Sequence, residues 1–129
     1  MNEIEQFVTL KGARHPELRR RVQWSGVRAI AAREGVHIRV MEMSRPGRLV
    51  SFGDRWEMQI SEDLSDGARA FTGVHELVHY WRDREDGATF YASMEWEPEP
   101  REDFANMVAW YLTSSAHEFY STRLSTQDE

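Results

Sequence analysis

The chain has 129 residues, 40% of them hydrophobic and 29% charged, which suits one domain with a modest core and excludes collagen-like and low-complexity chains. It contains no cysteine, which excludes disulfides, thiolate zinc clusters and a cysteine nucleophile, so any metal must be held by His, Asp or Glu. The formal net charge of −6 is concentrated in residues 65–129, where 5 basic residues stand against 13 acidic ones, and this disfavours bulk nucleic-acid binding.

The first predicted helix covers about residues 16–34. It begins at Pro16-Glu17, because proline suits the first helical turn and an acidic residue suits the positive end of a helix. Its apolar residues recur at roughly helical spacing, and Gly35 suits the position after the last turn. We therefore expect an N-terminal helix with one buried face.

Three short segments then alternate between apolar and other side chains, as half-buried strands do. Turn residues separate them, Pro46-Gly47 before the second segment and Gly53-Asp54 after it. We expect a small, mainly antiparallel sheet, and an extended substrate would add alongside the third strand if that strand lies at an edge. The three predicted strands cover about residues 36–41, 49–52 and 56–60.

Two further helices are predicted in the second half of the chain. Apolar residues at helical spacing indicate a central helix over about residues 66–82 and a last helix over about 101–115. The connection between them, residues 83–100, contains many acids together with glycine and proline, and we expect it to cross the surface. We expect residues 116–124 to continue or restart the last helix.

These elements predict a single α+β domain over residues 1–129, with its core at about 15–124. No internal repeat or linker divides the chain. The longest apolar run, residues 107–112, is far too short to span a membrane. Because the start of the chain lacks the basic and apolar regions of a signal peptide, we expect a cytoplasmic protein.

The predicted central helix carries the sequence His75-Glu76-Leu77-Val78-His79. Two imidazoles at this spacing lie one above the other on a helix and can bind a single ion. Glu76 lies beside that face, where its carboxylate can take a proton from a water molecule that attacks a carbonyl group. Since catalytic zinc usually takes three protein ligands, the pattern predicts a zinc site that needs one more.

Glu102, at the start of the last predicted helix, is our candidate for the third ligand, since the chain lacks the third histidine of the extended pattern HExxHxxGxxH. The face of the helix that carries Glu102 continues through Ala105, Asn106 and Ala109. Their short side chains would let this helix lie close to the central one. Asp103 points about 100° away on a helix and has a shorter reach, so we prefer Glu102.

The run ISEDLSDGARAFTGVHELVHYW, followed by an acidic loop and EDFANMVAWYL, resembles the ImmA/IrrE-type metallopeptidases over about residues 36–113. The pattern of that family is a strand, a helix ending in HELGH, and a later ExEANxFAxxLL helix. The resemblance implies a small zincin-like domain in which an HExxH helix and a Glu-bearing helix close the metal site. It also implies that His75, His79 and Glu102 bind Zn²⁺ and that Glu76 is the general base.

The resemblance further implies a zinc-dependent endopeptidase whose substrate is a protein. Members of this family commonly cut a helix-turn-helix repressor in phage, mobile-element or stress-response circuits. The alternative is a catalytically silent zinc-binding module that holds a repressor or toxin partner. Neither reading requires direct contact with nucleic acid or membrane, and the oligomeric state stays open.

Other polar residues are candidates for supporting roles. His117, Tyr80 and Tyr111 could support a metal ligand by a hydrogen bond or donate to the developing oxyanion, and the sequence does not choose among them. His15 is interpreted as a helix-start residue and His37 as a strand residue on the less buried face, rather than as catalytic groups.

Overall fold

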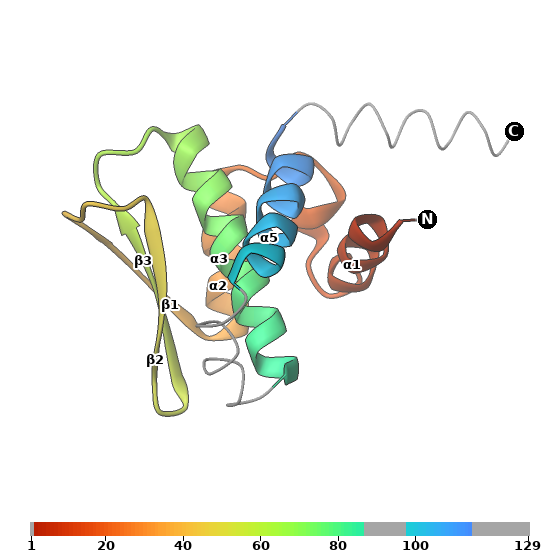
Figure 1. Ribbon diagram of the computed structural model, residues 1–129. Coiled ribbons are helices and arrows are strands. Elements are labelled where there is room, and N and C mark those ends of the chain that lie inside the picture. The colour runs from red at the N-terminus through yellow and green to blue at the C-terminus, as the bar shows by residue number, and fades with distance from the viewer. Residues whose placement is uncertain (1, 87–97, 115–129) are drawn as a thin grey trace, which may run out of the picture.

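Four α-helices lie on one side of a three-stranded sheet in the part of the chain that the computed structural model describes, residues 2–86 and 98–114 (Figure 1). This arrangement confirms the predicted α+β class. Helix α3 contacts both the sheet and α5, so it occupies the centre of the molecule. In chain order the elements are α1 (Glu3–Gly12), the 3-10 helix η1 (Pro16–Arg19), α2 (Trp24–Glu34), β1 (Val36–Met41), β2 (Gly47–Phe52), β3 (Arg55–Ser61), α3 (Asp66–Asp86) and α5 (Pro98–Thr113).

The third strand, β3, lies in the middle of the sheet, whose order is β1-β3-β2. β1 pairs with β3 in parallel, with Val36 opposite Trp56, whereas β2 and β3 form an antiparallel hairpin. The sheet is therefore mixed, and a mainly antiparallel arrangement holds only for the hairpin. The chain leaves β1 without turning back onto it, so the hairpin inserts β3 between the other two strands. Because β3 has no free edge, the predicted addition of a substrate alongside it is wrong.

The hydrophobic core lies between the sheet and α3. Strand β3 and helix α3 contribute side chains that have no exposed surface. These side chains alternate along β3 and follow the helical period along α3. Val78 is among them, so this residue of the HExxH segment faces the core. The fully buried residues of these two elements are Met58, Ile60, Val74, Leu77 and Val78.

Helix α1 lies outside the segments predicted from the sequence. Asn2 caps it by accepting a hydrogen bond from the backbone N–H of Glu5 at 2.8 Å. On its inner face the ring of Phe7 meets those of Trp81 and Phe104 edge to face, with centroid distances of 6.0 and 5.4 Å. The packed core therefore begins before residue 15, because α1 closes over the ends of α3 and α5.

The predicted helix over 16–34 is broken in two. Arg20 takes an extended conformation after η1, and α2 starts only at Trp24. The break lets the backbone N–H of Val22 donate to the carbonyl oxygen of Leu112 on α5 at 2.7 Å. This contact between elements overrides the local helical pattern. The predicted stop is confirmed, since Gly35 ends α2 in the left-handed conformation with φ of 77°.

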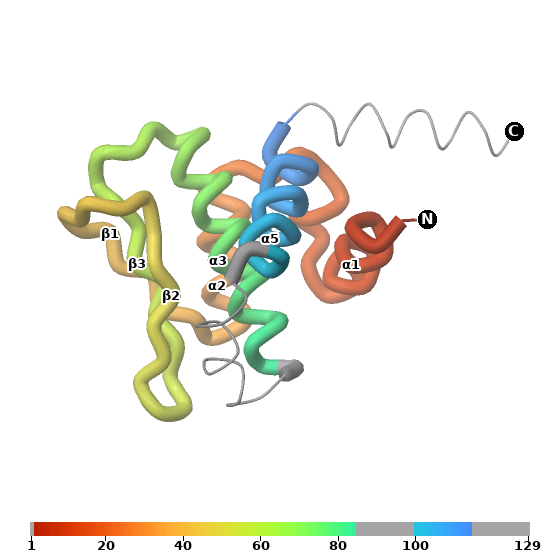
Figure 2. The backbone as a smooth tube through the Cα atoms, in the orientation of Figure 1, coloured from red at the N-terminus to blue at the C-terminus, as the bar shows by residue number. Residues whose placement is uncertain are grey.

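Figure 2 shows α3 and α5 side by side, and the contacts between them agree. Both helices were predicted, although α3 continues to Asp86 and α5 already begins at Pro98. The expected continuation over residues 116–124 lies outside the described residues. Among the helices that are described, none is both long and apolar enough to cross a membrane.

Candidate metal centre

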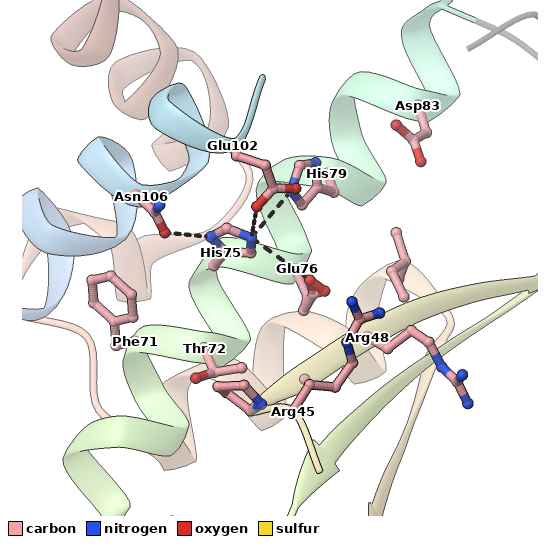
Figure 3. A pocket seen from close by; sticks show the side chains of 13 residues that line it. Arg45, Arg48, Phe71, Thr72, His75, Glu76, His79, Asp83, Glu102 and Asn106 are labelled. Carbon is pink, nitrogen blue, oxygen red and sulfur yellow. Dashed lines mark hydrogen bonds and ion pairs between the residues drawn. The ribbon is translucent and has the colours of Figure 1, made fainter. Parts of the chain in front are cut away.

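Helices α3 and α5 bring two imidazoles and one carboxylate together at the centre of the molecule (Figure 3). The Nε2 atoms of His75 and His79 lie 3.1 Å apart. Glu102 reaches both rings, with one carboxylate oxygen 3.0 Å from Nε2 of His75 and the other 2.9 Å from Nε2 of His79. The three side chains that were expected to hold a metal therefore converge, although they come from two separate helices.

The close approach of α5 to α3 depends on small side chains. Ala105 and Ala109 are fully buried, as expected for the face of α5 that continues from Glu102. A larger side chain at either position would push the two helices apart and carry the carboxylate away from the histidines. Asp103, the other acid at the start of α5, is exposed to solvent and does not line the cavity at this centre.

Asn106 is a residue of this centre that was predicted only as a short side chain on the helix face. Its Oδ1 atom lies 2.8 Å from Nδ1 of His75. An amide oxygen can only accept, so Nδ1 carries a proton, and in the neutral ring with this proton the lone pair is on Nε2. That lone pair lies on the side of Glu102 and His79. The signal in the sequence was the spacing from Glu102, which places Asn106 one turn later on the same face of α5.

Glu76 has a different environment from the other three side chains. It is 6% exposed, and its Oε2 atom is buried without a hydrogen-bond partner among the described residues. Burial and the negative charge of Glu102 raise the pKa of Glu76 to about 8, while the positive charge of Arg45 acts in the opposite direction. Such a carboxyl group can both accept and release a proton near neutral pH.

The spacing of the donor atoms fits a bound zinc ion. Ligands at about 2.0–2.2 Å from a tetrahedral ion lie about 3.3–3.6 Å from one another, so the separations of 2.9–3.1 Å among His75, His79 and Glu102 would widen by only about half an ångström around such an ion. Burial and the neighbouring His75 lower the pKa of His79 to about 4, so its ring is in the neutral form that binds metals. A set of two imidazoles and one carboxylate is a ligand set that zinc uses in hydrolases.

Two glutamates compete for the role of third ligand. Donor atoms of His75, Glu76 and His79 also lie within 4.8 Å of one another, so Glu76 belongs to the same cluster. However, Glu76 approaches Nε2 of His75 only to 3.8 Å, whereas Glu102 lies within 3.0 Å of both rings. Glu102 is therefore better placed than Glu76 to complete a ligand set with the two histidines, and the Glu76 carboxylate would then lie beside a bound ion.

A cavity of about 570 Å³ opens beside these residues. One wall is α3 and the other is the turn before β2 together with the first residues of β2, an edge strand. The lining residues from the turn and β2 are Arg45, Pro46, Gly47, Arg48 and Leu49.

The tyrosines considered for supporting roles do not line this cavity. The hydroxyl of Tyr80 donates to the backbone oxygen of Glu34 at 3.2 Å, and its ring packs edge to face on Trp56. Tyr80 follows His79 directly and so points about 100° away from it around the helix. Tyr111 is buried in the hydrophobic core. His117 lies outside the described residues.

The other two histidines lie away from the cavity, as expected. His15 is buried at the start of η1, where Arg33 donates to its Nδ1 atom at 2.7 Å. Since arginine cannot accept a hydrogen bond, the ring proton is on Nε2, which donates to Glu34 at 2.6 Å. His37 is exposed on β1, with Nε2 3.9 Å from Glu57.

Comparison with known proteins identifies a family. The model of the Peptidase M78 family, described as the IrrE N-terminal-like domain, matches residues 31–123, well over half of the chain. The match includes both helices of the candidate metal centre. No curated protein and no solved structure matched the chain. With the family match added to the geometry of α3 and α5, the chain belongs to the IrrE N-terminal-like domain family of peptidases.

Proposed function

We propose that the chain is a zinc-dependent endopeptidase that hydrolyses a peptide bond in a protein substrate. The observation that carries this proposal is the convergence of His75, His79 and Glu102 beside a buried carboxylate, Glu76, that lines an open cavity. Membership in a peptidase family supports it. The roles of the four residues in binding and catalysis are part of the proposal.

A zinc ion held by His75, His79 and Glu102 would lower the pKa of a water molecule to about 7 and polarise the carbonyl group of the substrate. Glu76 takes the proton from the attacking water at its carboxylate and passes that proton to the nitrogen of the leaving amine. Its burial suits this role, because a carboxylate whose pKa is raised is a stronger base and takes a proton from water more readily. Asn106 holds the His75 ring in place throughout.

The substrate is proposed to bind in an extended form along β2. This strand is at the edge of the sheet and lines the cavity, so its free backbone groups can pair with those of a peptide. The family resemblance suggests a helix-turn-helix repressor as the protein that is cut. A DNA-binding repressor acts in the compartment that holds the DNA, so the proposal includes the cytoplasmic location expected from the sequence.

The silent zinc-binding module is disfavoured by the state of Glu76. A buried carboxylate oxygen without a hydrogen-bond partner lowers stability, and a domain that only holds a partner gains nothing from it. In an endopeptidase the same group is the proton acceptor. The buried and unpaired Glu76 therefore favours the catalytic reading over the binding one.

The test is zinc-dependent cleavage by the purified chain. Protein prepared without chelator is expected to hold about one zinc per chain and to cleave members of a quenched-fluorescence peptide library or a helix-turn-helix protein encoded beside its gene. Removal of zinc with a chelator should abolish cleavage, and one equivalent of zinc should restore it. A chain that holds zinc but cleaves neither kind of substrate would contradict the proposal and support the silent module.

A further inference from the structure

The cavity contains two arginines whose guanidinium groups have different environments. Arg48 donates from Nε and Nη2 to the side-chain oxygen of Gln59 on β3, at 2.9 and 2.6 Å. Arg45 makes no hydrogen bond or ion pair with any described residue, and Figure 3 shows its side chain pointing toward Glu76. Its charge is close enough to act on the Glu76 carboxyl group. Arg45 is therefore a cation of the cavity that has hydrogen-bond donors to spare.

The backbone that carries Arg45 is held firmly against α3. The carbonyl oxygen of Pro46 accepts a hydrogen bond from the N–H of Ser61 at 2.8 Å, which ties the turn to the end of β3. Gly47 lies so close to α3 that an added Cβ would be 2.5 Å from Cγ2 of Thr72. Because Thr72 is one turn before the buried glutamate on the same helix, the contact at Gly47 fixes the backbone next to Arg45 relative to that carboxylate.

The proposed hydrolysis benefits from a hydrogen-bond donor at the oxygen of the scissile carbonyl group. As the water oxygen bonds to the carbonyl carbon, negative charge develops on the carbonyl oxygen, and a preorganised donor there lowers the barrier. The tyrosines of α3 and α5 that the sequence suggested, Tyr80 and Tyr111, do not line the cavity. Of the described lining residues, Asn106 is bonded to His75 and Arg48 to Gln59.

We propose that Arg45 is a catalytic residue that donates a hydrogen bond to the oxygen of the scissile carbonyl group. This assignment rests on the proposed function. The water oxygen bonds to the carbonyl carbon while Glu76 takes the water proton. The electron pair on the carbonyl oxygen then re-forms the C=O bond as the C–N bond breaks, and the proton on Glu76 passes to the amine nitrogen. The remaining hydroxyl proton of the new carboxyl group passes through Glu76 to the amine, so the products are a carboxylate and an ammonium group. Arg45 keeps its own protons throughout, because a guanidinium group does not ionise in this pH range.

The experiment compares Arg45→Gln and Arg45→Lys with the wild type on a peptide that the wild type cleaves. We expect Arg45→Gln to lower kcat about 100-fold, with KM within about threefold and zinc content unchanged. Arg45→Lys keeps the positive charge but loses the planar guanidinium group with its several N–H donors, so it should retain part of the activity. Arg39→Gln, which removes an exposed guanidinium on β1 away from the cavity, is the matched control and should behave as wild type.

A binding measurement gives a second readout. A phosphonamidate analogue of the cleaved peptide carries negative charge where the carbonyl oxygen develops it, so Arg45→Gln should weaken its binding about as much as it lowers kcat/KM. A kcat within about threefold of wild type, or a raised KM with unchanged kcat, would overturn the assignment while leaving the peptidase proposal intact. A zinc-loaded wild type that cleaves no peptide would overturn both.

Discussion

The side-chain oxygen of Asn106 lies 2.8 Å from Nδ1 of His75, so α5 orients a ring that belongs to α3. The preceding turn of α5 carries Glu102 on the same face, and Glu102 contacts both histidines. The two helices are thus connected by three polar contacts across a seam of small buried side chains. In the proposed zinc site, residues far from the HExxH segment would therefore determine how well that segment binds the metal.

Asn106→Ala is expected to weaken zinc binding by about 10-fold to 100-fold, because His75 loses the acceptor that fixes its ring and its proton. Asn106→Asp keeps an acceptor at the same position and should retain most of the affinity. Competition with a chromophoric chelator measures both. If Asn106→Ala binds zinc as tightly as wild type, Asn106 does not orient the ligand.

Glu102→Gln is expected to lower zinc affinity by about 100-fold or more, since a direct ligand matters more than the groups that support it. Asp103→Asn is the matched control, because it removes the same charge from the neighbouring exposed residue. Metal content after dialysis, measured by mass spectrometry of the intact chain, distinguishes them. If Asp103→Asn lost zinc while Glu102→Gln retained it, Asp103 and not Glu102 would be the third ligand.

Gly47→Ala is expected to destabilise the fold by about 1–3 kcal/mol, because the new Cβ would meet Cγ2 of Thr72 at 2.5 Å and push β2 away from α3. Thr72→Ser removes that methyl group and should recover much of the loss when the two changes are combined. Gly67→Ala has open space around its Cβ and serves as the control. Urea unfolding measures the free energies, and equal stability of Gly47→Ala and wild type would show that the contact is not tight.

The Glu17–Arg33 pair is expected to contribute less to stability in acid. Two hydrogen bonds from Arg33, at 3.0 and 2.8 Å, hold the pKa of Glu17 down to about 2 from its ordinary value of 4.5. A carboxyl group with a lowered folded-state pKa stabilises the fold above its unfolded pKa and loses this contribution as the pH falls through its folded pKa. The stability difference between wild type and Glu17→Gln should therefore shrink between about pH 4.5 and 2. A difference that stays constant over this range in urea unfolding would contradict this.

Much of the fold could be predicted because the signals were local. The apolar alternation of residues 36–40 and the helical period of α3 are properties of single segments, and the strand and the helix were both confirmed, although Val40 is exposed rather than half-buried. The parallel pairing of β1 with β3 was not predictable from alternation, since it depends on where the chain travels after the strand ends. Helix α1 was missed for a similar reason, because its order depends on Phe7 packing against Trp81 and Phe104.

The candidate site also contains some residues that local sequence signals predict and others that depend on contacts between elements. The spacing of His75 and His79 places both rings on one face of any helix, and the period of α5 singled out Glu102 before its partner was known. Arg45 could not be predicted, because its position depends on the turn after β1 and on the contact of Gly47 with α3. Tyr80 was a reasonable candidate by proximity in sequence, but the helical rotation turns it toward Glu34.

The most direct test of the central claim is the cleavage rate of Glu76→Gln in a sample shown to contain zinc. Glutamine keeps the size of the side chain but cannot take a proton from water. We therefore expect kcat to fall by about 100-fold to 10,000-fold while one zinc per chain is retained. Asp103→Asn, measured beside it, should cleave as wild type does. Cleavage at the wild-type rate by zinc-loaded Glu76→Gln would contradict the account.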